Sequence, residues 1–504
     1  MPTRVVDLGR PGSGSNPYIL ETGGRLGKYI ALSYCWGDGV KHPVKLKKSN
    51  YSAMLQGFVY GSLTRSHEEA LQVAQILGYR YIWIDALCII QDDSSDWEKE
   101  SSRMTECYHN AALTLIAGES DHSSKGFLSC SFEHCLNPVQ LDYTHLDAPG
   151  EKSDLYVCLP RSTETGPVAE RAWCFQEDLL SRRKLIFGRE QLFFNCASRD
   201  FHESGIVFNK NRSTSLDVKE IFLSLDLHTI GESPDVRREK VITAWYTIVQ
   251  EFSACSMFDP HDVFAAFMGV AKKVQGMLHS RYLAGLWEDD IIQGLLWQGV
   301  ADSMPGLGHA PLQRPVERNT KKPLRLGLPA IRAPSWSWAS VEGAVFRGHG
   351  QEDKTMFDVA NLCVKPIDYN PTRWTRQTDC DVNKVYMPVC ELEMFGAPKE
   401  VLCSRTPMPK ELKEDLRWRR SFSGAAIAKF AALVDVQQPN HIIGIGLFDV
   451  EQEKTDSLWC MRLVKDRGLL LRVDQEGKFH RLGKFVVLDE ARFQEESERR
   501  VALV

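Results

Sequence analysis

Two residues four positions apart, Trp173 and Glu177, give the clearest indication of chemistry in this chain. The pattern from Gly166 to Leu180 predicts the opening of a helix, on which both side chains share one face. An aromatic plane beside a partly desolvated carboxylate suits a ligand that carries a flat ring on a ribose. The alternative interpretation is packing, since a tryptophan near a helix start is commonly part of the core.

Length and composition limit the classes of protein. A chain of 504 residues exceeds what one hydrophobic core usually organises, so we expect two or three domains. The hydrophobic content of 43% and charged content of 25% are ordinary for a globular protein. The net charge of -5 gives no broad attraction for nucleic acid or for an anionic membrane, and we expect neither as a partner.

The sequence also indicates a location and the state of the thiols. The first residues lack an apolar run long enough for a signal peptide, and no later run has the length of a membrane span, so we expect a cytosolic or nuclear protein and favour the cytoplasm. Many of the 14 cysteines lie in apolar runs, where a reduced thiol behaves as a small buried side chain. These are Cys35, Cys88, Cys363, Cys390 and Cys460.

No metal site or resident cofactor is expected. Zinc usually needs two closely spaced ligand pairs, and Cys130 with Cys135 beside His134 has no obvious second pair. The chain also has no Walker loop, no HExxH, no GxSxG and no GxGxxG after a strand.

The region from Lys28 to about Phe201 alternates short apolar runs with amphipathic segments, which is typical of an open α/β sheet. Apolar runs predict strands over 28–35, 79–84, 112–117, 184–187 and 191–196. Helices are predicted over 66–78, with Ser66 as N-cap, and over 97–110. Residues 119–165 are rich in Ser, His, Asp and Gly and are predicted to be an insertion.

The pattern changes after this region. We predict an N-terminal α/β domain over 1–205, a mainly helical region over 206–330 and a β-rich domain over 331–504. The Trp336-Ser-Trp338 run alternates like a strand, and we expect both of its tryptophans in the core.

Three ordered motifs resemble the HET domain, the heterokaryon-incompatibility family of filamentous fungi. The motifs are Tyr29-Ile-Ala-Leu-Ser-Tyr-Cys-Trp-Gly37, Tyr81-Ile-Trp-Ile-Asp-Ala-Leu-Cys-Ile-Ile-Gln-Asp-Asp93 and Arg171-Ala-Trp-Cys-Phe-Gln-Glu-Asp-Leu-Leu-Ser-Arg-Arg183. This resemblance implies a role in fungal incompatibility and programmed cell death, with oligomerisation or a partner protein as the trigger.

A more distant resemblance to TIR domains bears on the reaction. Ser33-Tyr34, with Asp38 at the spacing of the TIR motif, is similar to the end of the first TIR strand. Trp173-Cys-Phe-Gln-Glu177 is similar to the TIR pattern Trp-Cys-x-x-Glu, whose glutamate is catalytic in members that cleave NAD. The resemblance therefore implies a TIR-like or flavodoxin-like parallel sheet, with Glu177 as the catalytic residue and NAD as substrate.

Strand topology predicts where a ligand binds. Ligands of open α/β sheets gather at the carboxyl ends of strands near the switch in strand order, here around 36–39 and 118–120. In the proposed cleavage, Glu177 stabilises the oxocarbenium-like ribose that forms as nicotinamide departs. Trp36 or Trp173 stacks on a ring of the substrate. The acidic loop over 86–96 is not expected to bind phosphate.

Other polar residues have structural alternatives. Asp85 either contributes to the ligand site or orients the next loop, and Asp38 either contributes or forms an Asx turn. Arg171 pairs either with a phosphate or with a carboxylate such as Glu177, while Glu100 and Arg103 favour a structural role. Two other functions stay open: a self-associating signalling module without turnover, and an isomerase or cyclase of secondary metabolism that uses the same crevice.

Overall fold

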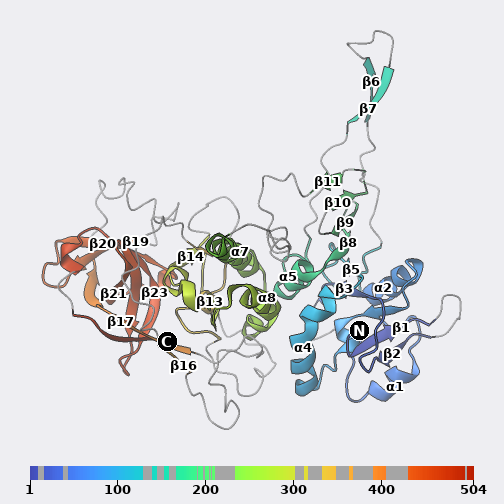
Figure 1. The fold of residues 1–504 in the computed structure, drawn as a ribbon, viewed down its shortest axis with the longest axis horizontal. Coiled ribbons are helices and arrows are strands. Elements are labelled where there is room, and N and C mark those ends of the chain that lie inside the picture. The colour runs from blue at the N-terminus through green and yellow to red at the C-terminus, as the bar shows by residue number, and fades with distance from the viewer. Residues whose placement is uncertain are drawn as a thin grey trace. The chain divides into compact units, whose positions relative to one another are not determined.

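The computed structural model describes most of the chain. The described residues are 1–9, 16–37, 44–128, 139–144, 152–157, 166–189, 191–196, 199–203, 205, 207–209, 233–300, 311–315, 332–347, 363–366, 390–404, 430–493 and 497–504. The chain divides into two compact units, Met1–Leu227 and His228–Val504 (Figure 1). The predicted order, with an α/β sheet first, helices in the middle and a β-rich portion last, is confirmed. The boundaries at 205 and 330 stay a prediction.

A nine-stranded mixed sheet forms the centre of the first unit. Its order is β11-β10-β9-β8-β5-β3-β4-β1-β2, and the pairs β3/β4, β3/β5 and β5/β8 are parallel. The strands are β1 (Arg4–Asp7), β2 (Tyr18–Glu21), β3 (Tyr29–Ser33), β4 (Tyr81–Trp83), β5 (Leu113–Ile116), β8 (Arg183–Phe187), β9 (Leu192–Cys196), β10 (Arg199–His202) and β11 (Val207–Asn209). A separate hairpin joins β6 (Val139–Thr144) to β7 (Lys152–Val157).

The parallel part has the flavodoxin-like order, with the first strand, β3, between the second, β4, and the third, β5. The chain leaves β3 toward β4 and then returns across β3 to β5. Right-handed crossovers in opposite directions place their helices on opposite faces of the sheet, as α2 and α4 lie in Figure 1. The helices are α1 (Tyr51–Gln56), α2 (Arg65–Ile76), α3 (Asp85–Cys88), α4 (Ser94–His109) and α5 (Ala172–Leu180).

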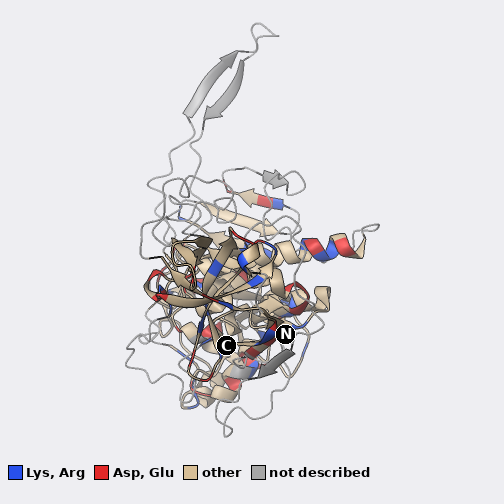
Figure 2. Ribbon diagram, turned by 90° about the vertical axis from the view of Figure 1, so that its left-hand side faces the viewer, with Lys and Arg blue, Asp and Glu red and all other residues tan. Residues whose placement is uncertain are grey.

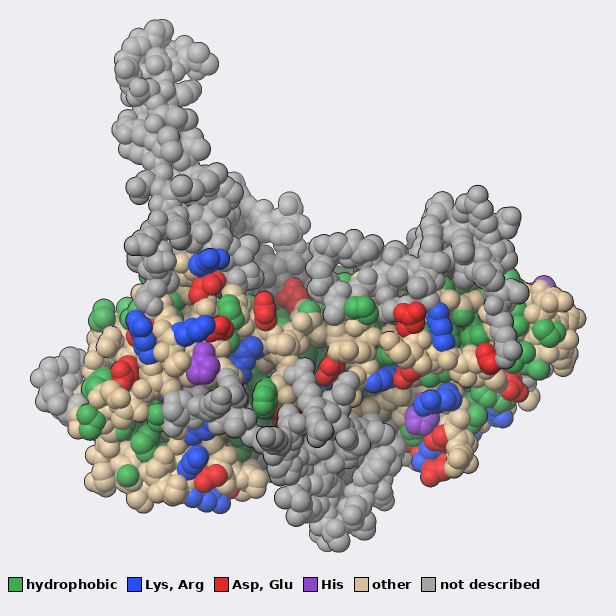
Figure 3. Space-filling view, turned by 180° about the vertical axis from the view of Figure 1, so that it is seen from behind, with side chains coloured by type: hydrophobic (Ala, Val, Ile, Leu, Met, Phe, Trp, Pro, Cys, Tyr) green, Lys and Arg blue, Asp and Glu red, His purple; other side chains and the backbone are tan. Residues whose placement is uncertain are grey.

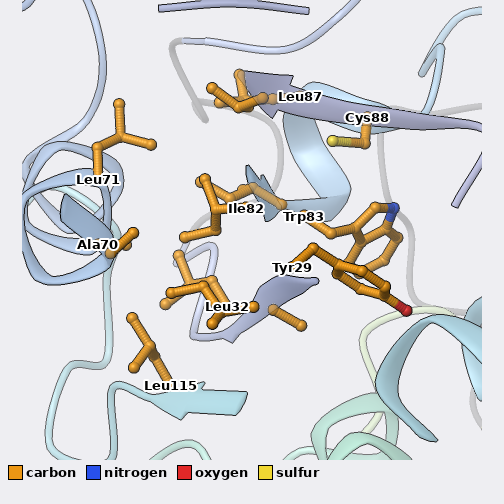
Figure 4. Packing of buried hydrophobic residues seen from close by; sticks show 14 of the residues in the cluster. Tyr29, Leu32, Ala70, Leu71, Ile82, Trp83, Leu87, Cys88 and Leu115 are labelled. Carbon is orange, nitrogen blue, oxygen red and sulfur yellow. The ribbon is translucent and has the colours of Figure 1, made fainter. Parts of the chain in front are cut away.

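Both layers of helices bury apolar side chains against the sheet. Ala70 and Leu71 of α2 face Leu32, Ile82 and other strand residues in the core (Figure 4). Strands buried on both faces read as continuous apolar runs, which is why β3 and β5 were recognisable.

Two local predictions are corrected in this unit. The N-cap of α2 is Thr64, whose hydroxyl accepts the His67 N–H, and Ser66 lies inside the helix. Helix α4 begins three residues before the predicted start, because the Asp93 carboxylate accepts the N–H groups of Ser95 and Asp96. The structural reading of Glu100 is supported by a 2.8 Å hydrogen bond that it accepts from Thr3.

The second unit joins helical segments to a closed barrel. Its helices are α7 (Pro234–Ala254), α8 (Met268–Leu278) and α9 (Ile291–Gly294), with short strand pairs β12 (Tyr282–Leu283) with β13 (Leu286–Trp287) and β14 (Trp297–Gly299) with β15 (Val345–Arg347). Trp336 and Trp338 are buried as predicted. They do not form a strand, however, because Ser337 caps a 3-10 turn over Trp338–Ser340.

The β-rich portion is one sheet that closes on itself. Pairing of β22 with β23 closes the ring β23-β20-β19-β18-β21-β22, and β24, β17 and β16 extend from β23. The strands are β16 (Cys363–Pro366), β17 (Cys390–Gly396), β18 (Lys399–Cys403), β19 (Phe430–Asp435), β20 (Ile442–Phe448), β21 (Ser457–Val464), β22 (Arg467–Val473), β23 (Phe479–Val487) and β24 (Arg499–Leu503). Strands β21 and β22 pair as an antiparallel hairpin.

A buried arginine connects the barrel to the helical segment of the same unit. Arg481 on β23 is fully buried and pairs with Asp449 at 2.8 Å. Its guanidinium lies 3.6 Å from the ring centroid of Trp297 and donates to the carbonyls of Trp297 and Leu295. Several groups thus share the charge, as a buried ion pair requires.

The described parts of the chain agree with several expected properties. Cys35, Cys88 and Cys460 are free and buried. The side chains of Cys363 and Cys390 lie outside the described residues, as do the whole of Cys130, His134 and Cys135.

None of the helices described here has the length and hydropathy needed to cross a bilayer. Basic and acidic side chains are interspersed along the ribbon (Figure 2) and over the visible surface (Figure 3).

Candidate active site

The carboxyl end of β3 supplies the first part of the site. Ser33, the last residue of β3, and Tyr34 are both buried, and Trp36 is half-buried. Gly37 follows with φ +82°, where a Cβ would lie 1.9 Å from Cδ2 of His122. A glycine is therefore required for the chain to turn and for the loop after β5 to approach it.

Asp85 joins the end of β4 to the end of β3. It opens α3, and its Oδ1 accepts the N–H of Ala86 at 2.7 Å. Its Oδ2 accepts the indole N–H of Trp36, also at 2.7 Å. Burial raises the pKa of the Asp85 carboxyl, against the lowering effect of these two donors. Two residues proposed for the ligand site are thus in direct contact.

The start of α5 is fastened to the backbone that follows β3. Arg171, the residue before the first turn, donates from Nη1 to the carbonyl oxygen of Tyr34 at 3.0 Å. Cys174 packs in a small apolar cluster with Cys35 and Ile116. Because Glu177 follows Cys174 by three positions, its side chain lies on the same face of α5, toward β3.

Glu177 is a buried carboxyl group with an unmet hydrogen-bonding capacity. The residue is 4% exposed, and neither its Oε2 nor the Oγ of Ser33 has a hydrogen-bond partner among the described atoms. Burial, and next the nearby charge of Asp85, raises the pKa of Glu177 to about 7, while Ser33, Arg171 and Tyr108 act to lower it. The group is therefore partly ionised near neutral pH.

Two polar residues that were not predicted from the sequence contact Tyr34 and Leu32. His67 of α2 lies fully buried, with Nε2 2.9 Å from the hydroxyl of Tyr34 and their rings edge to face. Tyr108 of α4 donates to the carbonyl of Leu32 at 3.0 Å, and its hydroxyl lies close enough to Glu177 to affect its pKa. His67 precedes Ala70 by three positions and Leu71 by four. This helical spacing could have predicted that His67 faces the sheet with them.

The two candidate tryptophans differ in position. Trp36 contacts Asp85, and Nζ of Lys45 lies 4.8 Å from the Trp36 ring centroid. Trp173 instead packs edge to face against Trp97 of α4, at 6.3 Å between centroids. Of the predicted site residues, the structure brings together Ser33, Tyr34, Trp36, Asp85, Arg171 and Glu177. Asp38 lies outside the described residues.

The first ten residues of the predicted insertion fold back beside the site. Ser123 donates from Oγ to the carbonyl of Trp36 at 3.2 Å, and its own carbonyl accepts the N–H of Ser66. Glu69 of α2 accepts the N–H groups of Phe127 and Leu128. This segment therefore packs beside the carboxyl ends of the strands.

The arrangement provides a carboxyl group that titrates near neutrality, a fixed guanidinium and an aromatic ring. No group of three or more potential metal ligands occurs among the residues that the structure describes. The residues present are suited to stabilising positive charge that develops close to Glu177.

Comparison with known proteins identifies this region. Residues 29–177 match the model of the family described as heterokaryon incompatibility protein (HET). Over 95 residues the chain is 30% identical to heterokaryon incompatibility protein 6, OR allele, of Neurospora crassa. The aligned residues make up 18% of this chain and 14% of the relative. The match therefore spans a small part of that curated relative. No solved structure has a significant match.

The matched region begins at β3 and ends at Glu177, so it contains every residue of the candidate site. The chain thus carries a heterokaryon incompatibility (HET) domain.

Proposed function

We propose that this protein acts in heterokaryon incompatibility and that its HET domain cleaves NAD between nicotinamide and ribose. The observation that carries the proposal is Glu177, whose buried Oε2 has no partner among the described atoms and whose pKa is raised to about 7. A carboxylate in this condition gains most from a ligand that brings positive charge or hydroxyl groups. The resemblance of Trp173-Cys-Phe-Gln-Glu177 to the TIR pattern supports the same residue.

The reaction requires few groups from the protein. The bond between the ribose carbon and the pyridinium nitrogen breaks, its electron pair goes to nicotinamide, and positive charge develops on the ribose. Ionised Glu177 stabilises that charge more in the transition state than in the ground state. Water then adds to the ribose carbon, which gives ADP-ribose and a proton. The positive charge of the nicotinamide ring in the bound substrate also favours ionisation of Glu177.

The biological role rests on the family and on the relative. Loss of NAD in a cytoplasm shared by two incompatible strains would stop metabolism and kill the fused cell, which is the outcome that the family resemblance implies. We place the protein in the cytoplasm and expect self-association or a partner protein to activate it. Glu177 is only 4% exposed, so the site must open before a dinucleotide can reach it.

The test is incubation of the full-length chain with NAD, followed by chromatography and mass spectrometry of the products. It is done at a series of protein concentrations and in a crowding agent, with the size of the assembly measured in parallel. Nicotinamide and ADP-ribose in equal amounts, increasing steeply with assembly, are the expected result. Assembly without products would favour the non-catalytic signalling module. Turnover of another small molecule but not NAD would favour the isomerase or cyclase.

A further inference from the structure

The ring of Trp36 already carries a cation on one face. Nζ of Lys45 lies 4.8 Å from the ring centroid, within the range of a cation-π contact. The edge of the same ring is fixed by the hydrogen bond to Asp85. The face of Trp36 is thus oriented by the protein and attracts positive charge.

The backbone of Lys45 is held in place beside the site. Its carbonyl accepts the Asn50 Nδ2 amide at 2.9 Å. The next residue, Leu46, is fully buried and donates its N–H to the carbonyl of Ala86 at 2.8 Å. The Leu46 carbonyl accepts the N–H of Gln91, also at 2.8 Å. These hydrogen bonds hold the backbone beside Lys45 next to Ala86, the residue that follows Asp85.

We infer that Lys45 is a specificity-determining residue that binds the diphosphate of the dinucleotide, and this inference rests on the proposed function. A pyridinium ring is a flat cation and suits the face of Trp36 that the Lys45 ammonium covers. When the pyridinium ring occupies that face, the ammonium must leave it. The dinucleotide itself supplies the anion with which the displaced ammonium pairs.

The charges of the site favour a cation near the diphosphate. Glu177 and Asp85 are both acidic, and they oppose the approach of a dianionic diphosphate. Arg171 already donates to the carbonyl of Tyr34. The acidic residues of the neighbouring loop have structural roles: Asp93 caps α4 and pairs with Lys48, and Asp96 pairs with Arg4. The ammonium of Lys45 lies over the face of Trp36, beside Asp85.

Lys45 should affect the binding of ligands that carry the diphosphate and not of ligands that lack it. NAD should depend on Lys45, whereas nicotinamide riboside, which has the same cationic ring but no phosphate, should not. In Lys45→Gln, nicotinamide riboside should bind as well as before or more tightly, because no ammonium competes for the face of Trp36.

The experiment measures binding of NAD, ADP-ribose and nicotinamide riboside to the assembled full-length chain by calorimetry. All variants also carry Glu177→Gln, so that turnover does not consume the ligand. Lys45→Gln is compared with Lys45→Arg, which keeps the charge, and with Lys47→Gln, a control at an exposed lysine two positions away.

We expect Lys45→Gln to weaken NAD and ADP-ribose by about tenfold or more, the loss expected for one charge-assisted hydrogen bond. Lys45→Arg should restore most of the affinity, and Lys47→Gln should not change it. Equal affinities for NAD in Lys45→Gln and its parent would overturn the inference even if the wild type cleaves NAD. If the affinity for NAD depends on Lys45 but the wild type never releases nicotinamide, the inference is supported and the proposed function is contradicted. Absence of NAD binding would overturn both.

Discussion

The indole nitrogen of Trp36 donates a 2.7 Å hydrogen bond to Oδ2 of Asp85, a residue 49 positions away in the sequence. The bond ties the loop after β3 to the first turn of α3. It fixes the direction of an aromatic ring that lies at the carboxyl ends of two parallel strands. The same Asp85 carboxylate raises the pKa of Glu177, after the larger effect of burial. One carboxylate thus affects both the proposed ring-binding residue and the proposed catalytic residue.

The bond between Trp36 and Asp85 predicts non-additive effects on stability. Trp36→Phe removes the donor and Asp85→Ala removes the acceptor, and each should lower the free energy of unfolding by about 1–2 kcal/mol. The double variant should lose less than the sum, because the bond between Trp36 and Asp85 can be lost only once. Urea unfolding of the four proteins, followed by circular dichroism, measures the coupling. Strictly additive losses would show that the bond contributes nothing.

Ionisation of Glu177 predicts a dependence of stability on pH. Its pKa is about 7 in the folded protein, raised from 4.5, so the folded state retains a proton that the unfolded chain has lost. The contribution of this carboxyl is complete below pH 4.5 and decreases as the pH rises through 7. Relative to Glu177→Gln, the wild type should lose about 3 kcal/mol between pH 4 and pH 8. Urea unfolding at these two pH values tests this, and a constant difference between the two proteins would contradict it.

The charge of Asp85 predicts a shift in the pH dependence of the reaction. The value of kcat/KM for NAD should increase with pH as Glu177 ionises, with a midpoint near its pKa of about 7. Asp85→Asn removes a neighbouring negative charge, which lowers the pKa of Glu177 and moves the midpoint to lower pH. An unchanged midpoint with a reduced rate would mean that Asp85 acts on structure alone.

The buried ion pair of the second unit predicts a large loss of stability. Arg481→Met leaves Asp449 and the carbonyls of Leu295 and Trp297 without their donor. Removing one partner of a buried pair usually costs about 3–5 kcal/mol. Arg472→Met, at an exposed arginine of β22, is the matched control and should have little effect. Thermal unfolding of both variants compares them, and similar melting temperatures would refute the role of Arg481.

The sequence predicted the parallel part of the sheet because its strands are buried on both faces. The apolar runs from Tyr29 to Ser33 and from Leu113 to Ile116 are typical of strands in a parallel sheet that is covered on both faces. The antiparallel strands β1 and β2 were not predicted, since each has only four residues with a charged residue at one or both ends, which gives little periodic signal.

Long-range contacts limited the rest of the prediction. The closure of the barrel by β22 and β23 depends on pairing that no local pattern encodes. The alternation of Trp336 and Trp338 fits a strand and a capped 3-10 turn equally well. Within the site, Glu177 and Asp85 could be selected from motifs, but the position of Lys45 over Trp36 depends on hydrogen bonds of Leu46 with the chain after β4.

The central claim is that the buried carboxyl of Glu177 carries the cleavage of NAD. Its most direct test is the rate of nicotinamide release at pH 8 by the assembled wild type, Glu177→Gln and Glu170→Gln, the last being an exposed glutamate just before the same helix. Glu177→Gln should lower the rate at least about 100-fold without loss of folded structure or assembly, whereas Glu170→Gln should match the wild type. Equal release of nicotinamide by the wild type and Glu177→Gln would contradict the claim.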